Sequence, residues 1–403
     1  MTDTNATIAF VSDEENPEIL VFDYVLGEFV GTLDSGAGGD EDNYPHYLAL
    51  SRDGSRLYAC SANDDFSKLY SFSVASDTLL NTADVQDLGQ AMNGGGVESS
   101  LPVTHGGDFV TGGYAQGNSV DRMDTASFVV LNIYDYYPIR GIALGPDDAK
   151  GFVWGSGGDQ EVYVYDVTAG AVDAGSPIAL TIIQVVGWQD PAGSRLFMFN
   201  NGTGGAEMQA VDTGTLVADA AVALPAGGYP YQAQFSNDSS RLYLLTDDPD
   251  AVLVIDASDG TVLSQIDLSA HGDPGGYMAI NRAGTKLAVS RYGPAWVALI
   301  DIGTETIGWI EMTRVCAQPV FSPDGSKIVL PAAPDYVASI DVSSFSEEFV
   351  VATPSPGYPR AVAVLGPLLA TQYQRIFGWR LNISDDALET VDPMLMSPES
   401  GSG

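Results

Sequence analysis

Short runs of apolar residues, interleaved with polar ones and separated by turn-forming residues, recur along almost the whole chain. The clearest copy lies between Val320 and Thr353, where three such runs follow one another: V-F-S-P-D-G-S-K-I-V-L, D-Y-V-A-S-I-D-V and S-E-E-F-V-V-A-T. Alternation places successive side chains on opposite faces of a strand. The pair Asp324-Gly325 is a hairpin signal, because glycine accepts a positive φ. Each copy therefore predicts a small antiparallel meander.

The spacing of the meanders predicts that they stack around an axis. Second strands are expected to begin at Gly151, Arg195, Arg241, Lys286 and Lys327, about 41 to 46 residues apart. This period suits a four-stranded propeller blade and is too long for ankyrin or leucine-rich repeats. A single meander cannot bury both of its apolar faces, so the copies must pack against one another.

These repeats predict an all-β fold: a single β-propeller over residues 1–394, followed by a polar tail at 395–403. Nine triplets of strands are recognisable, but only eight have a leading strand. We therefore expect about eight or nine four-stranded antiparallel blades. In the nine-bladed alternative the first blade has three strands, and in the eight-bladed one a terminal unit lies off the ring. We expect the ring to close near the termini, since open sheet edges invite aggregation.

A column of short polar residues marks the expected end of the third strand in each unit. Its members are Asp23, Ser73, Asn132, Asp166, Asp212, Asp256, Asp301, Asp341 and Asn382. Such side chains bind backbone N–H groups two residues further on and so begin a turn. Because the aspartates lie on successive blades, we expect them to make turns and not to bind a metal.

Tyr-Pro pairs precede the expected innermost strand in four units. They are Tyr44-Pro45, Tyr137-Pro138, Tyr229-Pro230 and Tyr358-Pro359. Proline suits the start of a strand because it lacks an N–H. Four candidate ligand-binding residues follow these pairs on the rim of the axial channel: His46, Tyr231 and Arg360 directly, and Arg140 one residue later, after Ile139. Arginines there suit a carboxylate or a sugar acid. They also suit the simpler role of neutralising nearby acids.

Two segments resemble a known repeat. Ser322-Pro323-Asp324-Gly325-Ser326-Lys327-Ile328-Val329 and the stretch from Asn237 to Asp256 are similar to the YVTN-type β-propeller repeat of surface-layer-like and lactonase-like propellers, which is akin to WD40 and NHL repeats. The resemblance extends over nearly the whole chain as a repeat pattern and implies a propeller. Lactonase-like members hold a divalent cation in the central channel, which implies a metal-dependent hydrolase as one alternative. The motif that would place its ligands is missing, so none is transferred.

The sequence contains no catalytic motif. Neither a G-x-S-x-G elbow nor a phosphate-binding G-x-x-x-x-G-K-[ST] loop is present, and His46, His105 and His271 fall in different units without metal-ligand spacing. We therefore expect no catalytic residues, no metal ligands and no cofactor. Calcium is the cation that the acidic loops at 34–43 and 247–250 would suit, although neither has EF-hand spacing.

Charge limits the classes of partner that the chain can bind, and the cysteine count bears on its thiol chemistry. The net charge is −37, from 53 acidic and 16 basic residues. Such a field repels nucleic acid and anionic lipid, so we expect neither as a partner. The two cysteines, Cys60 and Cys316, lie in apolar patterns and are expected to be buried thiols. With no signal peptide and no long apolar run, the chain is expected to be soluble and cytoplasmic at synthesis, without membrane insertion.

The sequence favours a non-catalytic binding or structural platform in a larger assembly over an enzyme. Its expected partners are other proteins, with oligomers formed through assembly, and a phage or virus particle component (a decoration, fibre or tail protein with virion subunits as partners) would suit the composition. One alternative is the lactonase-like hydrolase. Another is a carbohydrate or cell-surface receptor binder that uses the rim tyrosines Tyr44, Tyr137, Tyr229 and Tyr358.

Overall fold

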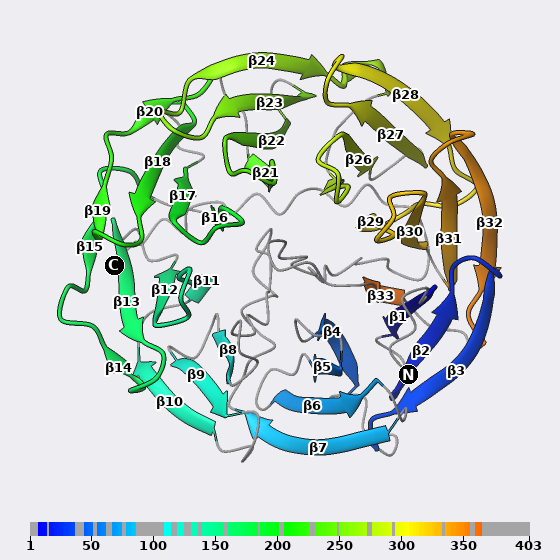
Figure 1. The fold of residues 1–403 in the computed structure, drawn as a ribbon, viewed down its shortest axis with the longest axis horizontal. Helices are drawn as coiled ribbons and strands as arrows, with labels where there is room; N and C mark the ends of the chain where they lie inside the picture. The colour runs from blue at the N-terminus through cyan, green and yellow to red at the C-terminus, as the bar shows by residue number, and fades with distance from the viewer. Residues whose placement is uncertain are drawn as a thin grey trace, which may run out of the picture.

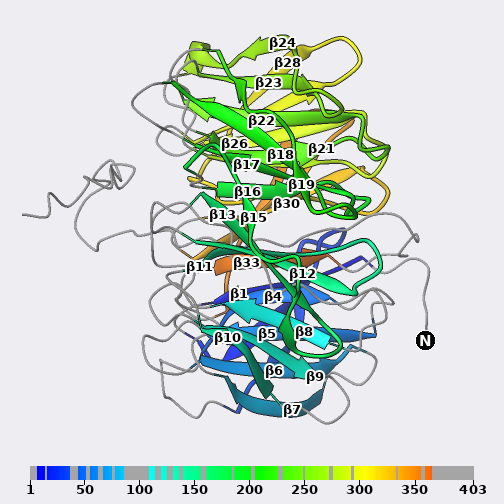
Figure 2. The same cartoon turned by 90° about the vertical axis from the view of Figure 1, so that its left-hand side faces the viewer.

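Antiparallel strands make up nearly all of the regular structure. The computed structural model describes residues 7–364 except 14–15, 37–43, 51–54, 62–66, 75–77, 86–108, 114–118, 125–129, 136–138, 156–159, 184–185, 201–204, 226–229, 248–249, 272–275, 292–294, 333–334 and 355–358. Figures 1 and 2 show sheets arranged around a central axis, each running from an inner to an outer strand. Within the described part, no helix has the length and apolar character needed to cross a membrane.

Seven sheets have four or five strands, and each is named here by its innermost strand. The β33 blade contains β33 (Pro359–Val364), β1 (Ile8–Asp13), β2 (Glu18–Asp23) and β3 (Glu28–Asp34). The β4 blade contains β4 (Pro45–Leu50), β5 (Arg56–Ser61), β6 (Ser67–Ser73) and β7 (Thr78–Val85). The β11 blade contains β11 (Ile139–Leu144), β12 (Lys150–Gly155), β13 (Glu161–Asp166), β14 (Ala171–Val172) and β15 (Ile178–Ala179). The β16 blade contains β16 (Val186–Gln189), β17 (Arg195–Phe199), β18 (Glu207–Asp212), β19 (Val217–Ala218) and β20 (Val222–Ala223).

The remaining sheets follow in the same order. The β21 blade contains β21 (Pro230–Phe235), β22 (Arg241–Asp247), β23 (Asp250–Asp256) and β24 (Val262–Asp267). A short 3-10 helix, η3 (Ser269–His271), leads to the β25 blade, which contains β25 (Gly276–Ile280), β26 (Lys286–Arg291), β27 (Trp296–Asp301) and β28 (Thr306–Glu311). The β29 blade contains β29 (Val320–Phe321), β30 (Lys327–Ala332), β31 (Tyr336–Asp341) and β32 (Ser346–Ala352). An incomplete sheet contains β8 (Phe109–Gly113), β9 (Ser119–Asp124) and β10 (Val130–Asp135).

The expectation of about eight or nine four-stranded blades is wrong. The described residues give seven blades of four or five strands, and β8–β10 form a sheet with three described strands. The first strand of the ninth triplet, β33, belongs to the first blade, because it pairs with β1 through partners such as Phe10 and Ala363. The three-stranded first blade is wrong for the same reason: β33 supplies its innermost strand. Residues 365–403, including the predicted tail, lie outside the described part.

Apolar side chains from neighbouring blades form the core. One cluster joins the β16 and β21 blades through Trp188, Phe197 and Phe199 on one side and Phe235 and Leu244 on the other. A second joins the β25 and β29 blades, and a third joins the β33 and β4 blades. Burial between sheets stabilises by about 25 cal/mol per Å² of apolar surface. Stacking of neighbouring blades therefore buries the apolar faces that a single meander would leave exposed to water.

Aspartates make turns at the ends of the third strands, as predicted. Asp23 accepts hydrogen bonds from the N–H groups of Val25 and Leu26, each at 2.9 Å, and Asp341 accepts one from Ser344 at 2.8 Å. Asp166, Asp212, Asp256 and Asp301 make the equivalent bonds. The third unit departs from the prediction, because its middle strand β9 ends at Asp124. Asn132 instead lies inside β10, and Asn382 lies outside the described residues.

Neither cysteine forms a disulfide within the described residues, and both are buried, as predicted. Cys60 is fully buried and Cys316 is almost so. Burial raises the pKa of the Cys316 thiol to about 12, with a further contribution from the negative charge of Glu347. A thiol with so high a pKa is a poor nucleophile at neutral pH, so Cys316 acts as a small core residue.

Candidate functional site

The four candidate residues lie in the innermost strands of four different blades. His46 is the second residue of β4, Arg140 of β11, Tyr231 of β21 and Arg360 of β33. Figure 1 shows these strands nearest the centre of the ring. The backbone of all four residues therefore lies toward the centre of the ring, and their role in ligand binding stays a prediction.

Each candidate position coincides with an irregularity in the strand ladder. In the β4 blade, Pro45 pairs with Ser61 and Tyr47 with Cys60, so His46 is an extra residue without a partner position. In the β21 blade, Pro230 pairs with Thr246 and Gln232 with Leu245, which leaves Tyr231 as the extra residue. Both are β-bulges, which redirect side chains and occur often at the rims of closed sheets and beside functional sites.

Arg140 lies one residue further from its Tyr-Pro pair than the other candidates do, but the pairing of β11 with β12 places it at the equivalent position. Ile139 pairs with Gly155 and Gly141 pairs with Trp154, so Arg140 is the extra residue of this bulge. Ile139 thus occupies the place that proline takes in the β4 and β21 blades. Arg140 is the structural equivalent of His46 and Tyr231.

The β33 blade carries a fourth bulge. Pro359 pairs with Asp13 and Val362 with Val11, so Arg360 and its neighbour Ala361 together face the single residue Ser12. Asp13 is fully buried. We call the end of the ring defined by His46, Arg140, Tyr231 and Arg360 the bulged rim.

Gln318 joins this set, although no sequence motif marks it. The pairs Cys316–Ala332 and Val320–Val329 enclose three residues on the inner side and two on the other, so the start of the β29 blade also holds an extra residue. The side chain of Gln318 is only 6% exposed, and its buried Oε1 has no hydrogen-bond partner among the described residues. A buried, unsatisfied amide oxygen costs free energy and calls for an explanation, such as a ligand.

Gln232, beside the Tyr231 bulge, is also partly unsatisfied. It is fully buried, and its Oε1 accepts a hydrogen bond from the N–H of Met278 in the next blade. Its Nε2 has no partner in the described part of the chain. Gln234, two residues on, donates from Nε2 to the carbonyl of Met278 at 3.0 Å. These contacts fix the inner strands of the β21 and β25 blades relative to each other.

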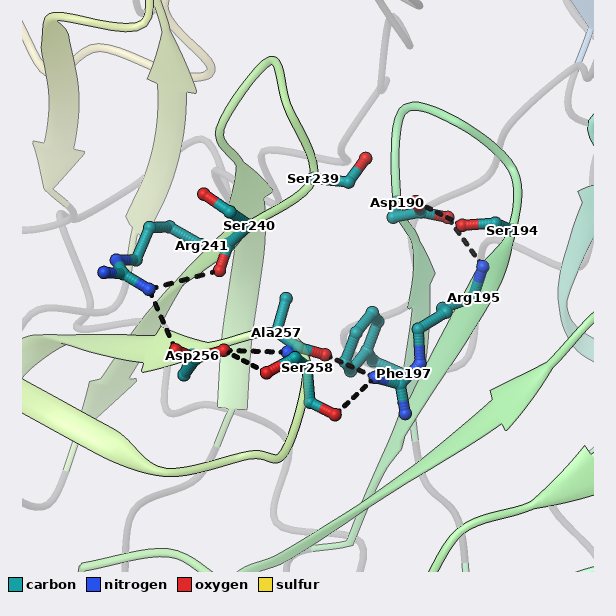
Figure 3. A pocket seen from close by; sticks show the side chains of 10 residues that line it. All are labelled: Asp190, Ser194, Arg195, Phe197, Ser239, Ser240, Arg241, Asp256, Ala257 and Ser258. Atoms are coloured by element: carbon teal, nitrogen blue, oxygen red, sulfur yellow. Dashed lines mark hydrogen bonds and ion pairs between the residues drawn. The ribbon is translucent and has the colours of Figure 1, made fainter.

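A pocket of about 460 Å³ lies between the β16 and β21 blades (Figure 3). Its lining includes Asp190, Ser194, Arg195, Ser239, Arg241 and Asp256. Arg241 is the first residue of β22, whereas Thr246, near the other end of that strand, faces the residue before the Tyr231 bulge. The pocket is therefore at the opposite end of the strands, which we call the hairpin rim.

Both terminal nitrogens of Arg195, which lines this pocket, have partners. Its Nη1 donates to the carbonyls of Ala257 and Ser258 in the neighbouring blade, at 2.6 and 2.9 Å, and its Nη2 pairs with Asp219. Its backbone N–H donates to Asp190 at 2.7 Å. Arg195 therefore links two blades.

Arg241 is only half engaged. Its Nη1 lies 3.1 Å from Oδ2 of Asp256 and 3.4 Å from the carbonyl of Ser240. The Nε and Nη2 atoms have no partner within the described residues. Hydrogen bonds from Ser258 chiefly, together with the charge of Arg241, hold the pKa of Asp256 below its usual value. Asp256 thus stays ionised and orients the guanidinium.

The other proposed chemistries gain no support from the described residues. No group of three or more His, Cys, Asp or Glu side chains there could hold a metal ion. His271 packs against the tilted rings of Trp296 and Trp309, with ring centroids 4.1 and 4.4 Å away, and η3 directly follows β24, the outermost strand of the β21 blade. Among the rim tyrosines, Tyr44 is buried, and the other three lie outside the described residues, as does His105.

The comparisons with known proteins show the fold. No protein-family model and no curated protein matches the sequence. Among solved structures, the chain is similar to dihydro-heme d1 dehydrogenase NirN in complex with DHE, at 14% identity and a TM-score of 0.69 over 91% of this chain and 76% of that one. AztD from Citrobacter koseri has 12% identity and a TM-score of 0.61, covering 87% and 96%. Kuenenia stuttgartiensis hydrazine synthase has 14% identity and a TM-score of 0.56, covering 77% and 96%. The β-propeller is thus confirmed, and the YVTN assignment stays a prediction.

Proposed function

We propose that this β-propeller is a non-catalytic binding platform whose bulged rim holds a small ligand that carries carboxylate groups. One observation supports the proposal: His46, Arg140, Tyr231 and Arg360, which come from four separate blades, all occupy bulge positions at the start of an innermost strand. A bulge in one blade has a local explanation. The same bulge in four blades, at residues that suit ligand binding, favours a shared role.

Charge favours an acidic ligand. The chain has only 16 basic residues against 53 acidic ones, and two of its arginines take equivalent bulge positions. Guanidinium groups bind carboxylates through two parallel hydrogen bonds. His46 and Gln318 would add hydrogen bonds without adding a carboxylate of their own. The competing role for Arg360 is to neutralise the buried Asp13, whose partner in the ladder directly precedes it.

The similar solved structures suggest one ligand with which to test binding. The NirN structure is described as a complex with DHE, and at 14% identity this likeness extends to the fold alone. Haem is a useful probe because its propionates present two carboxylates on an apolar ring. Other proteins remain the expected partners for the outer surface. Neither the fold nor these neighbours provide an argument for a place in a virus particle.

The test is calorimetric titration of the purified chain with succinate, citrate and haem, repeated with Arg140→Ala and Arg360→Ala. We expect at least one probe to bind, and each variant to weaken that binding about tenfold, which corresponds to roughly 1.4 kcal/mol. Arg282→Ala is the matched control because Arg282 lies in the hairpin before β26, on the hairpin rim. Binding that both rim variants leave unchanged would remove the rim from the proposal. Bound stoichiometric calcium or magnesium together with lactone hydrolysis would replace it with the hydrolase alternative.

A further inference from the structure

We infer that the pocket between the β16 and β21 blades is a second ligand site, which binds vicinal hydroxyl groups of a carbohydrate or a similar neutral polyol. The pocket lies on the hairpin rim and shares no residue with the bulged rim. The inference is therefore independent of the proposed function. Its volume, about 460 Å³, falls within the roughly 300–1,000 Å³ of small-molecule sites.

Arg241 has a free guanidinium edge. Asp256 and the carbonyl of Ser240 occupy Nη1, and Nε and Nη2 have no partner in the described part of the chain. These two groups point in the same direction on a rigid plane and can donate to two adjacent oxygen atoms. A vicinal diol presents oxygen atoms at that spacing.

Ser239 has a strained backbone beside the pocket. Its φ is +57°, in the left-handed region, and the corresponding hairpin positions in other blades include Gly193, Gly284 and Gly325, with φ of +71°, +67° and +72°. A side chain at such a position costs free energy that glycine avoids. The Ser239 hydroxyl lines the pocket and has no hydrogen-bond partner among the described groups (Figure 3). A strained residue with an unused polar group beside a cavity indicates a binding role.

Asp190 sets the charge of the ligand. Its carboxyl group lines the pocket, is 3% exposed, and accepts from the N–H of Arg195 and the hydroxyl of Ser194, which are both neutral donors to it. Arg195 and Arg241 pair with Asp219 and Asp256, so neither cation compensates Asp190 directly. An anionic ligand would be repelled here. A neutral polyol has several hydroxyl groups, so one can donate to Asp190 while two others accept from Arg241, without a charge of its own.

Two sister blades provide the variant for the test. At the position of Arg241 they have Lys286 and Lys327, which pair with Asp301 and Asp341 at 2.7 and 2.9 Å. Arg241→Lys should therefore keep the ion pair with Asp256 while removing the free guanidinium edge. The experiment measures binding of glucose, galactose, mannose and N-acetylglucosamine by saturation-transfer NMR and calorimetry. We expect at least one sugar to bind, and Arg241→Lys to weaken it at least tenfold with an unchanged thermal midpoint.

Ser239→Gly separates a binding role from a structural one. It removes the hydroxyl and the left-handed strain together, so we expect sugar binding to fall two- to fivefold while the thermal midpoint stays the same or rises. Asp148→Gly is the control, because Asp148 has a φ of +58° in another hairpin and does not line the pocket. It should leave binding unchanged. If no sugar binds the wild type, or if both Arg241→Lys and Ser239→Gly bind like the wild type, the inference is overturned.

Discussion

The Nζ atom of Lys327 lies 2.9 Å from Oδ2 of Asp341, across the ladder that pairs the two residues at the start of β30 and the end of β31. Lys286 and Asp301 repeat this arrangement at 2.7 Å, and Arg241 pairs with Asp256 at 3.1 Å. The strand-end aspartate thus has two tasks. One carboxylate oxygen accepts backbone N–H groups of the turn, and the other accepts the cation from the neighbouring strand.

Removing Lys327 should destabilise the β29 blade. Its side chain is 13% exposed and also binds Glu348 at 2.6 Å, so Lys327→Met leaves two carboxylates close together without a cation. We expect a loss of about 1–2 kcal/mol in the free energy of unfolding, since the pair is partly screened by solvent. Urea denaturation measures this loss. The side chain of Lys286 is 32% exposed and has one acidic partner among the described residues, so Lys286→Met should cost less; an equal cost would argue against the network.

A second prediction concerns the turn after Asp301. Glu305 has a φ of +56°, at the position that glycine takes in the turns that contain Gly27, Gly170 and Gly260. It is exposed, and its only hydrogen bond in the described part comes from the hydroxyl of Ser264. Glu305→Gly should therefore raise the free energy of unfolding by about 0.5–1 kcal/mol.

Leu216 is the contrasting case for this turn. It also has a positive φ, +59°, but its side chain packs against the core of the β11 blade and would clash with a Cβ added at Gly175. Leu216→Gly should lose that packing and lower the thermal midpoint, whereas Glu305→Gly raises it. A lower midpoint for Glu305→Gly would show that strain at this position is not the dominant effect.

The turn aspartates also predict a pH dependence. The ion pair with Lys286, and then the hydroxyl and N–H of Thr304, lower the pKa of Asp301 to about 2. A carboxyl group whose pKa is lower in the folded than in the unfolded chain stabilises the fold above the unfolded value, near 3.9, and that contribution is lost as the pH falls toward 2. Asp301→Asn removes the titrating group and keeps an oxygen that can accept from Thr304.

The measurement is the difference in thermal midpoint between wild type and Asp301→Asn as a function of pH. We expect the wild type to be more stable at pH 6, and the gap to narrow between about pH 4 and pH 2. The difference is needed because acidification also relieves repulsion among the carboxylates of a chain with a net charge of −37, which acts in the opposite direction. A constant gap across this range would contradict the assignment.

The sequence was sufficient for the fold class and for the local turns. Alternating runs, the repeat period and the strand-end aspartates all depend on residues close together in the chain, so they can be predicted from the sequence alone. The blade count was not, because it depends on the pairing of Phe10 with Ala363 from the other end of the described chain. No local sequence pattern predicts which distant strand completes a blade.

Some residues of the candidate sites could likewise be predicted from the sequence, and others depend on strand pairing. The Tyr-Pro pairs pointed to His46 and Tyr231, but the equivalence of Arg140 depends on which residue pairs with Gly155. Gln318 was missed because no Tyr-Pro pair precedes it, and an extra residue is a property of two strands together. The pocket was missed because Arg195 and its acceptor Ala257 are 62 residues apart. Contacts between blades cannot be predicted from the sequence pattern of a single repeat.

The last prediction concerns an aromatic ring that covers a glycine. Gly151 pairs with Tyr165 across β12 and β13, and a Cβ added to Gly151 would fall within the buried ring of Tyr165. Gly151→Ala must therefore displace that ring, and overpacking of this kind costs about 1–3 kcal/mol. Tyr165→Leu provides the room, so the double variant should lose less stability than the sum of the two single variants. Urea denaturation of all four proteins gives the coupling free energy, and simple additivity would show that the ring does not lie over Gly151.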